Sequence, residues 1–349
     1  MRCLVIHPGP NFSVADVHNG WVEALRELGI EVASYNLDDR LLFYSQVLMK
    51  TGENDETGHP VVKPAMTQEQ AFTAALQGIT HALYTFWPDI VICVSAFFMQ
   101  AGILQVMRAR NHKIVILHTE SPYQEEEQLV RAPFADLNVL NDPVSLHRYD
   151  ELGIPAVYMP HCYRPSVHYP RTGPVKGNLS ADLAFIGTGF ASRIAFFEAM
   201  DLKGLDVLLA GNWIDLAESS PLREYVAHDL GDCCDNAEAA EIYRNAKAGL
   251  NFYRRETEDD GSAAGWAMSP REAEMAACGM FFMRESRGEG DEVLPMLPCF
   301  AGPEDASEQL RWWLGHEGFR GEAALKARAA IADRTFANNA RRLLELLRT

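Results

Sequence analysis

Residues 244–283 have the sequence RNAKAGLNFYRRETEDDGSAAGWAMSPREAEMAACGMFFM, and other parts of the chain repeat its pattern. Ala248–Tyr253 is predicted to be a buried strand, and a polar, glycine-bearing loop follows it. A helix is predicted from Pro270 and a second apolar strand at Met280–Met283. Strand, helix and strand in this order are typical of α/β folds with a parallel sheet. We expect a ligand site at the loop and at the start of the helix.

The helix start carries a capping pattern in Ser269-Pro270-Arg271-Glu272. A capping serine, a proline at the first helical position and a glutamate at the third are typical of a capping box. The free N–H groups, the positive end of the helix dipole and the Arg271 guanidinium favour an anionic group such as a phosphate. Glu272 is expected to complete the box, whereas Glu274 lies about 200° around the helix from it. Glu274 is therefore the candidate for ligand binding, and a solvated helix position is the alternative.

The motif Arg271-x-x-Glu274, followed by residues 275–279 (MAACG), resembles the donor-site helix of GT-B glycosyltransferases. The spore-maturation (CgeB-like) group is the most similar, and residues 242–254 are similar to the segment that precedes this helix in that group. The resemblance implies a nucleotide-sugar site in which Arg271 is catalytic and Glu274 binds the ribose. It adds further donor-binding residues: Asn251, Arg254, Ser269 and Pro270. Trp266 departs from the family-4-like pattern, because it occupies the position of the first of two glutamates.

The chain has 349 residues, which is too long for one ordinary core and predicts two domains. Its composition, 48% hydrophobic and 23% charged, is that of a globular protein, and no apolar run is long enough to span a bilayer. Residues 1–10 lack the pattern of a signal peptide, so we expect a cytoplasmic protein. Seven scattered cysteines predict reduced thiols. The formal net charge of −17 disfavours loose binding of polyanions.

The first half of the chain alternates apolar strands with amphipathic helices, beginning with a strand at Arg2–Ile6. This alternation predicts a doubly wound, Rossmann-like domain. The first turn, Pro8-Gly9-Pro10, lacks the fingerprint of dinucleotide sites and indicates a tight turn near a ligand. The GT-B resemblance implies an approach to the acceptor here, which places Gly9 and Asn11 on the acceptor side. Residues 41–65 are polar and irregular, and we expect a mobile insertion there.

A second candidate site follows the strand predicted at Lys113–Leu117, where residues 118–123 read HTESPY. Open α/β sheets bind ligands beyond the carboxyl ends of their strands, so we expect the acceptor here. His118 or Glu120 should orient the acceptor hydroxyl or take its proton, with Tyr123 on the acceptor side. His118 is favoured because an imidazole shares a proton near neutral pH without a large pKa shift. The alternative is a strand-end histidine that bonds to the backbone.

The second half restarts after a segment rich in proline and glycine, which predicts domains at 1–165 and 181–349 joined by a linker at 166–180. After a strand at Ala181–Ile186, the turn with Gly187 and Gly189 is expected to present N–H groups to a diphosphate. Arg193 just downstream is expected to add a cation there, and a surface helix position is its alternative.

The remaining segments predict two helices, at Glu304–Trp313 and Glu322–Leu347. The GT-B resemblance implies that the terminal helix crosses back to the first domain. His161, Cys162 and His168 form no complete set of metal ligands, so no metal site is expected.

These patterns predict a GT-B fold, in which two Rossmann-like, doubly wound α/β domains face each other across a cleft. We expect transfer of a sugar from a nucleotide-diphosphate sugar, such as a UDP-sugar, to a hydroxyl acceptor, which the sequence leaves open among saccharide, small molecule, protein and nucleic acid. The chain contains no D-x-D triplet, so we expect no metal and no cofactor beyond the nucleotide sugar. The family-4 likeness implies retention of the anomeric configuration. The alternatives are a non-catalytic nucleotide-sugar-binding protein, because Trp266 replaces a glutamate, and a nicotinamide-dependent oxidoreductase, which the incomplete glycine turns disfavour.

Overall fold

The computed structural model describes residues 1–10, 14–255 and 265–348. The chain divides into two compact units, one of Met1–Met159 with Leu343–Thr349 and one of Pro160–Arg342. Both units are α/β and each is built on a parallel sheet.

The segment expected to be a linker, residues 166–180, forms hydrogen bonds inside the second unit. Arg244 Nη1 donates to the carbonyl oxygen of Val167 at 2.7 Å, and Lys176 N donates to Asn245 Oδ1 at 2.7 Å. These bonds satisfy polar backbone groups that turn-rich sequences otherwise leave to solvent. The segment therefore belongs to the surface of the second unit.

The first unit has a six-stranded parallel sheet with the order β2-β1-β5-β6-β7-β8. Its strands are β1 (Arg2–Ile6), β2 (Glu31–Tyr35), β5 (Ile90–Val94), β6 (Lys113–Leu117), β7 (Leu137–Leu140) and β8 (Ala156–Tyr158). Its α-helices are α1 (Ala15–Glu27), α2 (Leu37–Ser45), α3 (Gln68–Phe86), α4 (Ala101–Ala109), α5 (Glu125–Leu129) and α6 (Leu146–Glu151), with 3₁₀ turns at Ala132–Phe134 and Pro143–Ser145.

The core of this unit follows from alternating side chains on the strands. Leu4, Val91 and Ile114 share one core with Leu76 of α3 and Met107 of α4, so these helices cover one face of the sheet. Every residue of β5 is buried, as expected for a central strand of a parallel sheet that is covered on both faces. Because β5 pairs in register with β1 and β6, the loops that follow these three strands start side by side.

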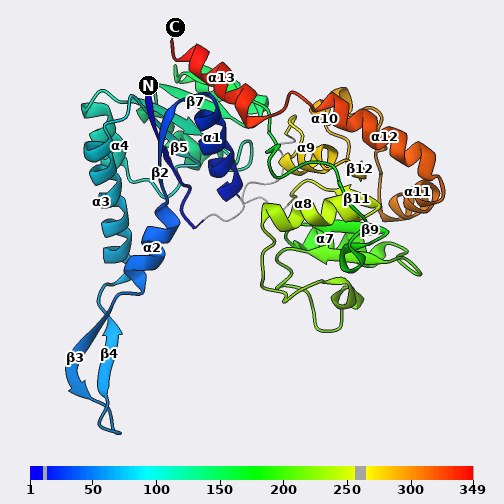
Figure 1. Ribbon diagram of the computed structural model, residues 1–349, viewed down its shortest axis with the longest axis horizontal. Helices are drawn as coiled ribbons and strands as arrows, with labels where there is room; N and C mark the ends of the chain where they lie inside the picture. The colour runs from blue at the N-terminus through cyan, green and yellow to red at the C-terminus, as the bar shows by residue number, and fades with distance from the viewer. Residues whose placement is uncertain (11–13, 256–264, 349) are drawn as a thin grey trace. The chain divides into compact units, whose positions relative to one another are not determined.

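The irregular structure expected for residues 41–65 is wrong, whereas their mobility stays a prediction. The end of α2 is followed by an antiparallel hairpin of β3 (Leu48–Asn54) and β4 (Pro60–Pro64), which extends away from the parallel sheet (Figure 1). Asp55 Oδ1 holds the turn by accepting hydrogen bonds from Thr57 N (2.8 Å) and His59 N (2.9 Å). Nearly all hairpin residues are exposed on both faces, so the sequence lacks the apolar alternation that identifies a strand.

The second unit has a four-stranded parallel sheet with the order β10-β9-β11-β12. Its strands are β9 (Leu183–Ile186), β10 (Val207–Ala210), β11 (Ala248–Asn251) and β12 (Phe281–Arg284). Its helices are α7 (Ala191–Ala199), α8 (Asn236–Asn245), α9 (Pro270–Ala277), α10 (Gly288–Val293), α11 (Pro303–Gly315), α12 (Glu317–Ala330) and the start of α13 (Phe336–Leu346), with 3₁₀ turns at Gly177–Leu179 and Pro221–Tyr225. Strands and helices alternate from β9 to β12, as predicted for a second Rossmann-like unit.

Helix α9 packs closely on β11 because Gly249 has no side chain. A Cβ at this position would lie 2.9 Å from Met275 Sδ and 3.1 Å from Met280 Cε. Gly279 has φ at +77° and follows the end of α9, as expected for a left-handed cap. The close packing holds α9 against the sheet.

The helix predicted over Glu322–Leu347 is interrupted, and the structure contains α12 and α13 instead. Between them, Tyr163 N donates to the carbonyl oxygen of Arg334 at 3.0 Å, and Tyr163 pairs with Thr335 as an isolated bridge. Backbone pairing with a distant segment replaces helical bonds there, which local propensity does not reveal. None of the helices in the described ranges combines the length and apolar character needed to cross a membrane.

Candidate active site

Two glycine turns pack against each other at the carboxyl ends of β9 and β10. Gly211 has φ at +102°, and a Cβ there would lie 2.6 Å from the carbonyl oxygen of Gly187. The N–H of Gly189 donates to the carbonyl oxygen of Asn212 at 2.7 Å, and a Cβ at Gly189 would lie 2.4 Å from the buried indole of Trp213. The absence of side chains is what lets these turns approach each other.

Three predicted donor-site arginines gather around the first turn through two phenylalanine rings. The guanidinium carbons of Arg193 and Arg271 lie 5.5 Å and 5.4 Å from the centre of the Phe185 ring. Those of Arg193 and Arg254 lie 5.0 Å and 5.3 Å from the centre of the Phe190 ring. Cation–π contacts of this length are attractive, and more so where water is displaced. The fold thus collects three positive charges at one strand end.

Arg193 is buried, with 6% of its surface exposed, so the surface alternative for this residue is wrong. Its Nη1 donates to the carbonyl oxygen of Thr188 at 3.0 Å and its Nη2 to that of Phe252 at 3.2 Å. These bonds join the glycine turn after β9 to the end of β11. Arg193 is therefore part of the frame of the site as well as one of its charges.

Asn251 lies at the centre of this arrangement and is fully buried. Its Oδ1 accepts hydrogen bonds from Arg271 Nη1 (3.1 Å) and Ser269 Oγ (3.0 Å). Its Nδ2 has no hydrogen-bond partner among the described residues. A buried donor without a partner costs roughly 1 to 3 kcal/mol, so this amide is suited to donate to an oxygen of a bound anion.

The start of α9 is closed by Glu272, as predicted. Its Oε2 accepts hydrogen bonds from Ser269 N (2.7 Å) and from the Tyr253 hydroxyl (2.6 Å). Burial raises the pKa of Glu272, and the hydrogen bond from Tyr253 is the first of the effects that oppose this rise. Glu272 is thus a structural residue that fixes the entry into α9.

Glu274, two positions further along α9, faces α8. Its Oε1 accepts a hydrogen bond from Asn236 Nδ2 at 3.1 Å, and its side chain is half-buried. Glu274 is therefore not a solvated helix residue, and its predicted contact with a ribose stays a prediction. Pro270 is exposed at the helix start.

His118, the favoured proton acceptor, is buried in the first unit at the end of β6. Its Nε2 lies 2.8 Å from Asn138 Oδ1, while Asn138 Nδ2 donates to the carbonyl oxygens of Ala132 and Pro155, both at 3.1 Å. This amide orientation requires the proton of a neutral imidazole to be on Nε2. Burial lowers the pKa of His118 to about 4, so the premise of titration near neutral pH is wrong.

The other first-unit candidates lie near the ends of β1 and β6. Glu120 is half-buried, and its N–H donates to Gln128 Oε1 at 3.3 Å. Tyr123 is half-buried, and its N–H donates to the carbonyl oxygen of Glu120 at 2.7 Å. Gly9 is buried with φ at +85°, whereas Asn11 lies outside the described residues.

Sequence reasoning missed the aromatic part of the donor-side cluster. Phe185 and Phe190 flank the glycine turn in the sequence, and this position could have indicated their contacts with the arginines. Trp266 packs on the start of α10, where a Cβ at Gly288 would lie 2.2 Å from its Cδ1. The described parts of the chain contain no group of three or more His, Cys, Asp or Glu side chains that could hold a metal ion.

Comparison with known proteins gives one family and a set of similar folds. Residues 193–345 match the family described as glycosyl transferase-like. Sucrose-phosphate synthase from Thermosynechococcus elongatus is similar with a TM-score of 0.62 and 13% identity, covering 100% of this chain and 98% of that chain. Trehalose-6-phosphate synthase (OtsA) is similar with a TM-score of 0.63 and 12% identity, covering 100% and 99%. The chain has the GT-B fold of these structures.

The family match contains Arg193, Arg254, Arg271 and Glu274, whereas the first-unit candidates lie outside it. UDP-GlcNAc 2-epimerase from Neisseria meningitidis, bound to UDP-GlcNAc, has a TM-score of 0.59 and 9% identity, covering 100% of both chains. The same fold therefore serves a different reaction, and the fold alone does not define the chemistry. No curated protein matches the sequence.

Proposed function

We propose that this protein is a glycosyltransferase, which moves a sugar from a nucleotide-diphosphate sugar to a hydroxyl acceptor without a metal ion and with retention of the anomeric configuration. The observation that carries the proposal is the cluster of Arg193, Arg254 and Arg271 on the Phe185 and Phe190 rings, together with the buried Asn251 Nδ2, which has no hydrogen-bond partner among the described residues. A diphosphate has the charge and the acceptor oxygens that such a cluster would bind.

The chemistry follows from where charge develops. The acceptor oxygen forms a bond to the anomeric carbon, the bond from that carbon to the diphosphate oxygen breaks, and the diphosphate leaves with the electron pair. Arginine guanidiniums and the Asn251 amide would stabilise the negative charge on the leaving group in the transition state. The hydroxyl proton would pass to the departing diphosphate, because burial lowers the pKa of His118 to about 4 and makes it a weak base at neutral pH.

Two further features support the finer parts of the proposal. The UDP-GlcNAc bound to the similar epimerase makes UDP the first nucleotide to test. The Arg271-x-x-Glu274 motif supports both ribose binding by Glu274 and retention. Metal independence is supported by the arginines, because fixed cations can do for the leaving group what a divalent ion does in other transferases.

A panel of nucleotide sugars, read first by thermal shift and then by nucleotide release with mixed acceptors, tests the proposal. We expect a UDP-sugar to stabilise the protein and to release UDP only when an acceptor is present. Arg271→Ala should weaken binding of UDP by at least about tenfold, since it removes a charge-assisted contact worth about 1.5 to 3 kcal/mol. Arg328→Ala, which removes an exposed arginine on α12, is the matched control and should bind UDP like the wild type.

Other outcomes would favour other functions. Binding without turnover would indicate a nucleotide-sugar-binding protein, and conversion of the sugar without transfer would indicate an epimerase. We expect EDTA to leave turnover unchanged, and loss of activity that only magnesium or manganese restores would refute metal independence. The coupling constant of the anomeric proton in the product, measured by NMR, reports retention or inversion.

A further inference from the structure

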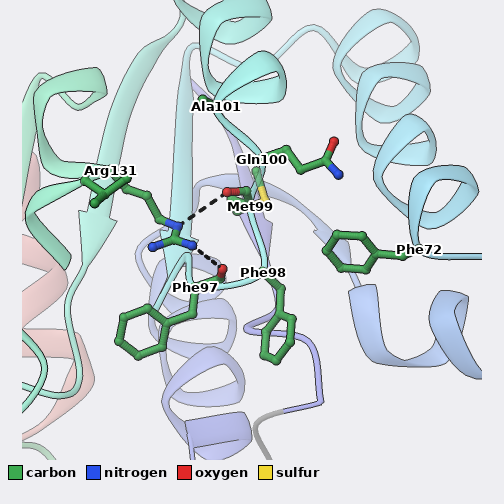
Figure 2. Close-up of a pocket in the computed structure, with 8 residues that line it drawn as sticks. Phe72, Phe97, Phe98, Met99, Gln100, Ala101 and Arg131 are labelled. Atoms are coloured by element: carbon green, nitrogen blue, oxygen red, sulfur yellow. Dashed lines mark hydrogen bonds between the residues drawn. The ribbon is translucent and has the colours of Figure 1, made fainter. Parts of the chain in front are cut away.

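A pocket of about 350 Å³ lies in the first unit, beside the loop that joins β5 to α4 (Figure 2). Its walls include Phe72 of α3, Phe97, Phe98 and Met99 of the loop, and Val130 and Arg131 after α5. This volume is within the range of small-molecule sites. The pocket lies at the carboxyl edge of the sheet, where open α/β sheets bind their ligands.

The walls of this pocket are mainly aromatic. Phe72 extends from α3 toward Phe98 in Figure 2, and their ring centres are 6.5 Å apart with an interplanar angle of 70°. Phe97 and Phe98 are only half-buried, so apolar ring surface remains in contact with solvent. Val130 extends this apolar surface outward, since 68% of the residue is exposed. A planar apolar group would cover these rings and gain the stacking energy that aromatic contacts provide.

Arg131 holds the loop in place instead of offering a free charge to the pocket. Its Nη2 donates to the carbonyl oxygen of Phe97 at 2.6 Å and its Nε to that of Met99 at 3.4 Å, the two dashed bonds in Figure 2. Its Nη1 donates to the carbonyl oxygen of Glu127 at 2.8 Å. The guanidinium is therefore engaged with backbone groups, and the described part of the lining favours an apolar ligand over a phosphorylated one.

The backbone that presents the two phenylalanines is strained. Ser95 and Ala96 have φ of +62° and +61°, although neither is glycine. Such conformations cost of order 1 to 3 kcal/mol each and persist where the surrounding structure holds them, often at ligand sites. Here they turn the chain directly after β5, so that Phe97 and Phe98 reach the pocket.

The pocket adjoins the two places where the acceptor is expected. A Cβ at Gly9 would lie 3.1 Å from the Phe98 ring, so the turn after β1 contacts the pocket wall. On the other side, the charge of Arg131 acts on His118, although burial is the main influence on that imidazole. The aromatic pocket is therefore flanked by the ends of β1 and β6.

We propose that this pocket binds the ring system of an aromatic acceptor, so that the acceptor of this enzyme is an aromatic small molecule with a hydroxyl group. This inference rests on the proposed glycosyl transfer and names its acceptor class. The hydroxyl is the group that receives the sugar, and the ring supplies the binding energy.

The test uses the full chain with UDP present and 2-naphthol as the aromatic alcohol, whose own fluorescence reports binding. We expect saturable binding, and we expect Phe98→Ala and Val130→Glu each to raise the Kd for 2-naphthol about tenfold or more. Val130 is exposed, so Val130→Glu tests the pocket even if Phe98→Ala does not fold. The control is Phe43→Ala on α2, where an aromatic side chain 60% exposed lies outside the pocket lining; it should leave the Kd unchanged.

Two results would overturn the inference. One is an equal Kd for 2-naphthol in the wild type, Phe98→Ala and Val130→Glu. The other is transfer of sugar to glucose with neither binding nor glycosylation of 2-naphthol. The affinity for UDP, measured by calorimetry in the same variants, should not change. If the proposed function is wrong, the wild type will not bind UDP in this calorimetry. The two kinds of failure are therefore distinguished by separate measurements.

Discussion

Two glutamates on α9 differ in burial and in hydrogen bonding, although they lie only two residues apart. Glu272 is fully buried, and its carboxylate accepts hydrogen bonds from Ser269 N and the Tyr253 hydroxyl, so its role is structural. Glu274 is half-buried, and its Oε1 accepts a hydrogen bond from Asn236 Nδ2 at the start of α8, at 3.1 Å. Glu274 therefore has no task in the helix cap and remains the candidate for ribose binding.

We predict that Glu274→Ala weakens binding of the donor by about 1 to 3 kcal/mol, which is roughly five- to 150-fold in Kd, because it leaves the ribose hydroxyls without an acceptor. Isothermal titration with UDP measures this change. Glu308→Ala, an exposed glutamate on α11, is the control. Unchanged affinity in Glu274→Ala would remove Glu274 from the donor site.

The burial of His118 argues against the general-base role that its residue type suggests. Because burial lowers its pKa to about 4, it stays neutral during turnover near pH 7, and its Nε2 is held by Asn138. We predict that His118→Ala lowers kcat by less than the roughly hundredfold expected for loss of a general base. The kcat of a well-folded variant, measured across pH 5 to 8, decides between the two roles. A loss of two to four orders of magnitude would restore His118 as the base.

At the scale of elements, the glycine turn after β9 and the start of α9 depend on each other. A Cβ at Gly187 would lie 2.8 Å from Arg271 Nη2, which is the mobile end of a side chain. A Cβ at Gly211 would instead meet the backbone of Gly187 at 2.6 Å, which cannot move without the strand. A side chain at Gly187 would therefore disturb the candidate site, whereas one at Gly211 would disturb the fold.

We predict that Gly187→Ala lowers donor affinity, because the new methyl group displaces the Arg271 guanidinium. Gly211→Ala should instead lower the midpoint of thermal unfolding by several degrees, because it meets backbone and has an unfavourable positive φ. Calorimetric titration and thermal unfolding of both variants separate these effects. Equal donor affinity in Gly187→Ala and the wild type would contradict the proposed position of the diphosphate.

At the scale of the whole molecule, buried histidines make stability depend on pH. Burial lowers the pKa of His18 and His118 to about 4 and that of His168 to about 3. In the unfolded chain these histidines take up a proton as the pH falls through about 6.5. In the folded chain they stay neutral until the pH reaches about 4 or lower. Between these values the unfolded state binds more protons, so stability falls as the pH falls.

We predict that the free energy of unfolding decreases steeply from pH 6.5 to pH 4, with a contribution on the order of 1 to 3 kcal/mol from each fully buried histidine. Urea unfolding at several pH values measures it. His118→Asn should reduce the slope, and His81→Asn, which changes an exposed histidine on α3, should not. A slope that is the same in His118→Asn would show that His118 does not contribute.

Local patterns in the sequence were enough for the strands and the caps. The strands β1 and β6 lie where predicted, and α9 starts after Ser269 as expected. These features depend on side-chain alternation and on hydrogen bonds between residues three positions apart, which a single sequence contains. The motif Arg271-x-x-Glu274 also identified the family to which the second half is similar.

Only the tertiary structure decided which charges and rings meet. Arg193 and Arg271 share the Phe185 ring although they lie far apart along the chain, and the break before α13 depends on pairing with Tyr163. Burial of His118 likewise results from the packing of β6 against its neighbours, and it changes the proton chemistry that the residue type suggested. Such contacts depend on how the whole chain packs, because desolvation and charge act through space and not along the sequence.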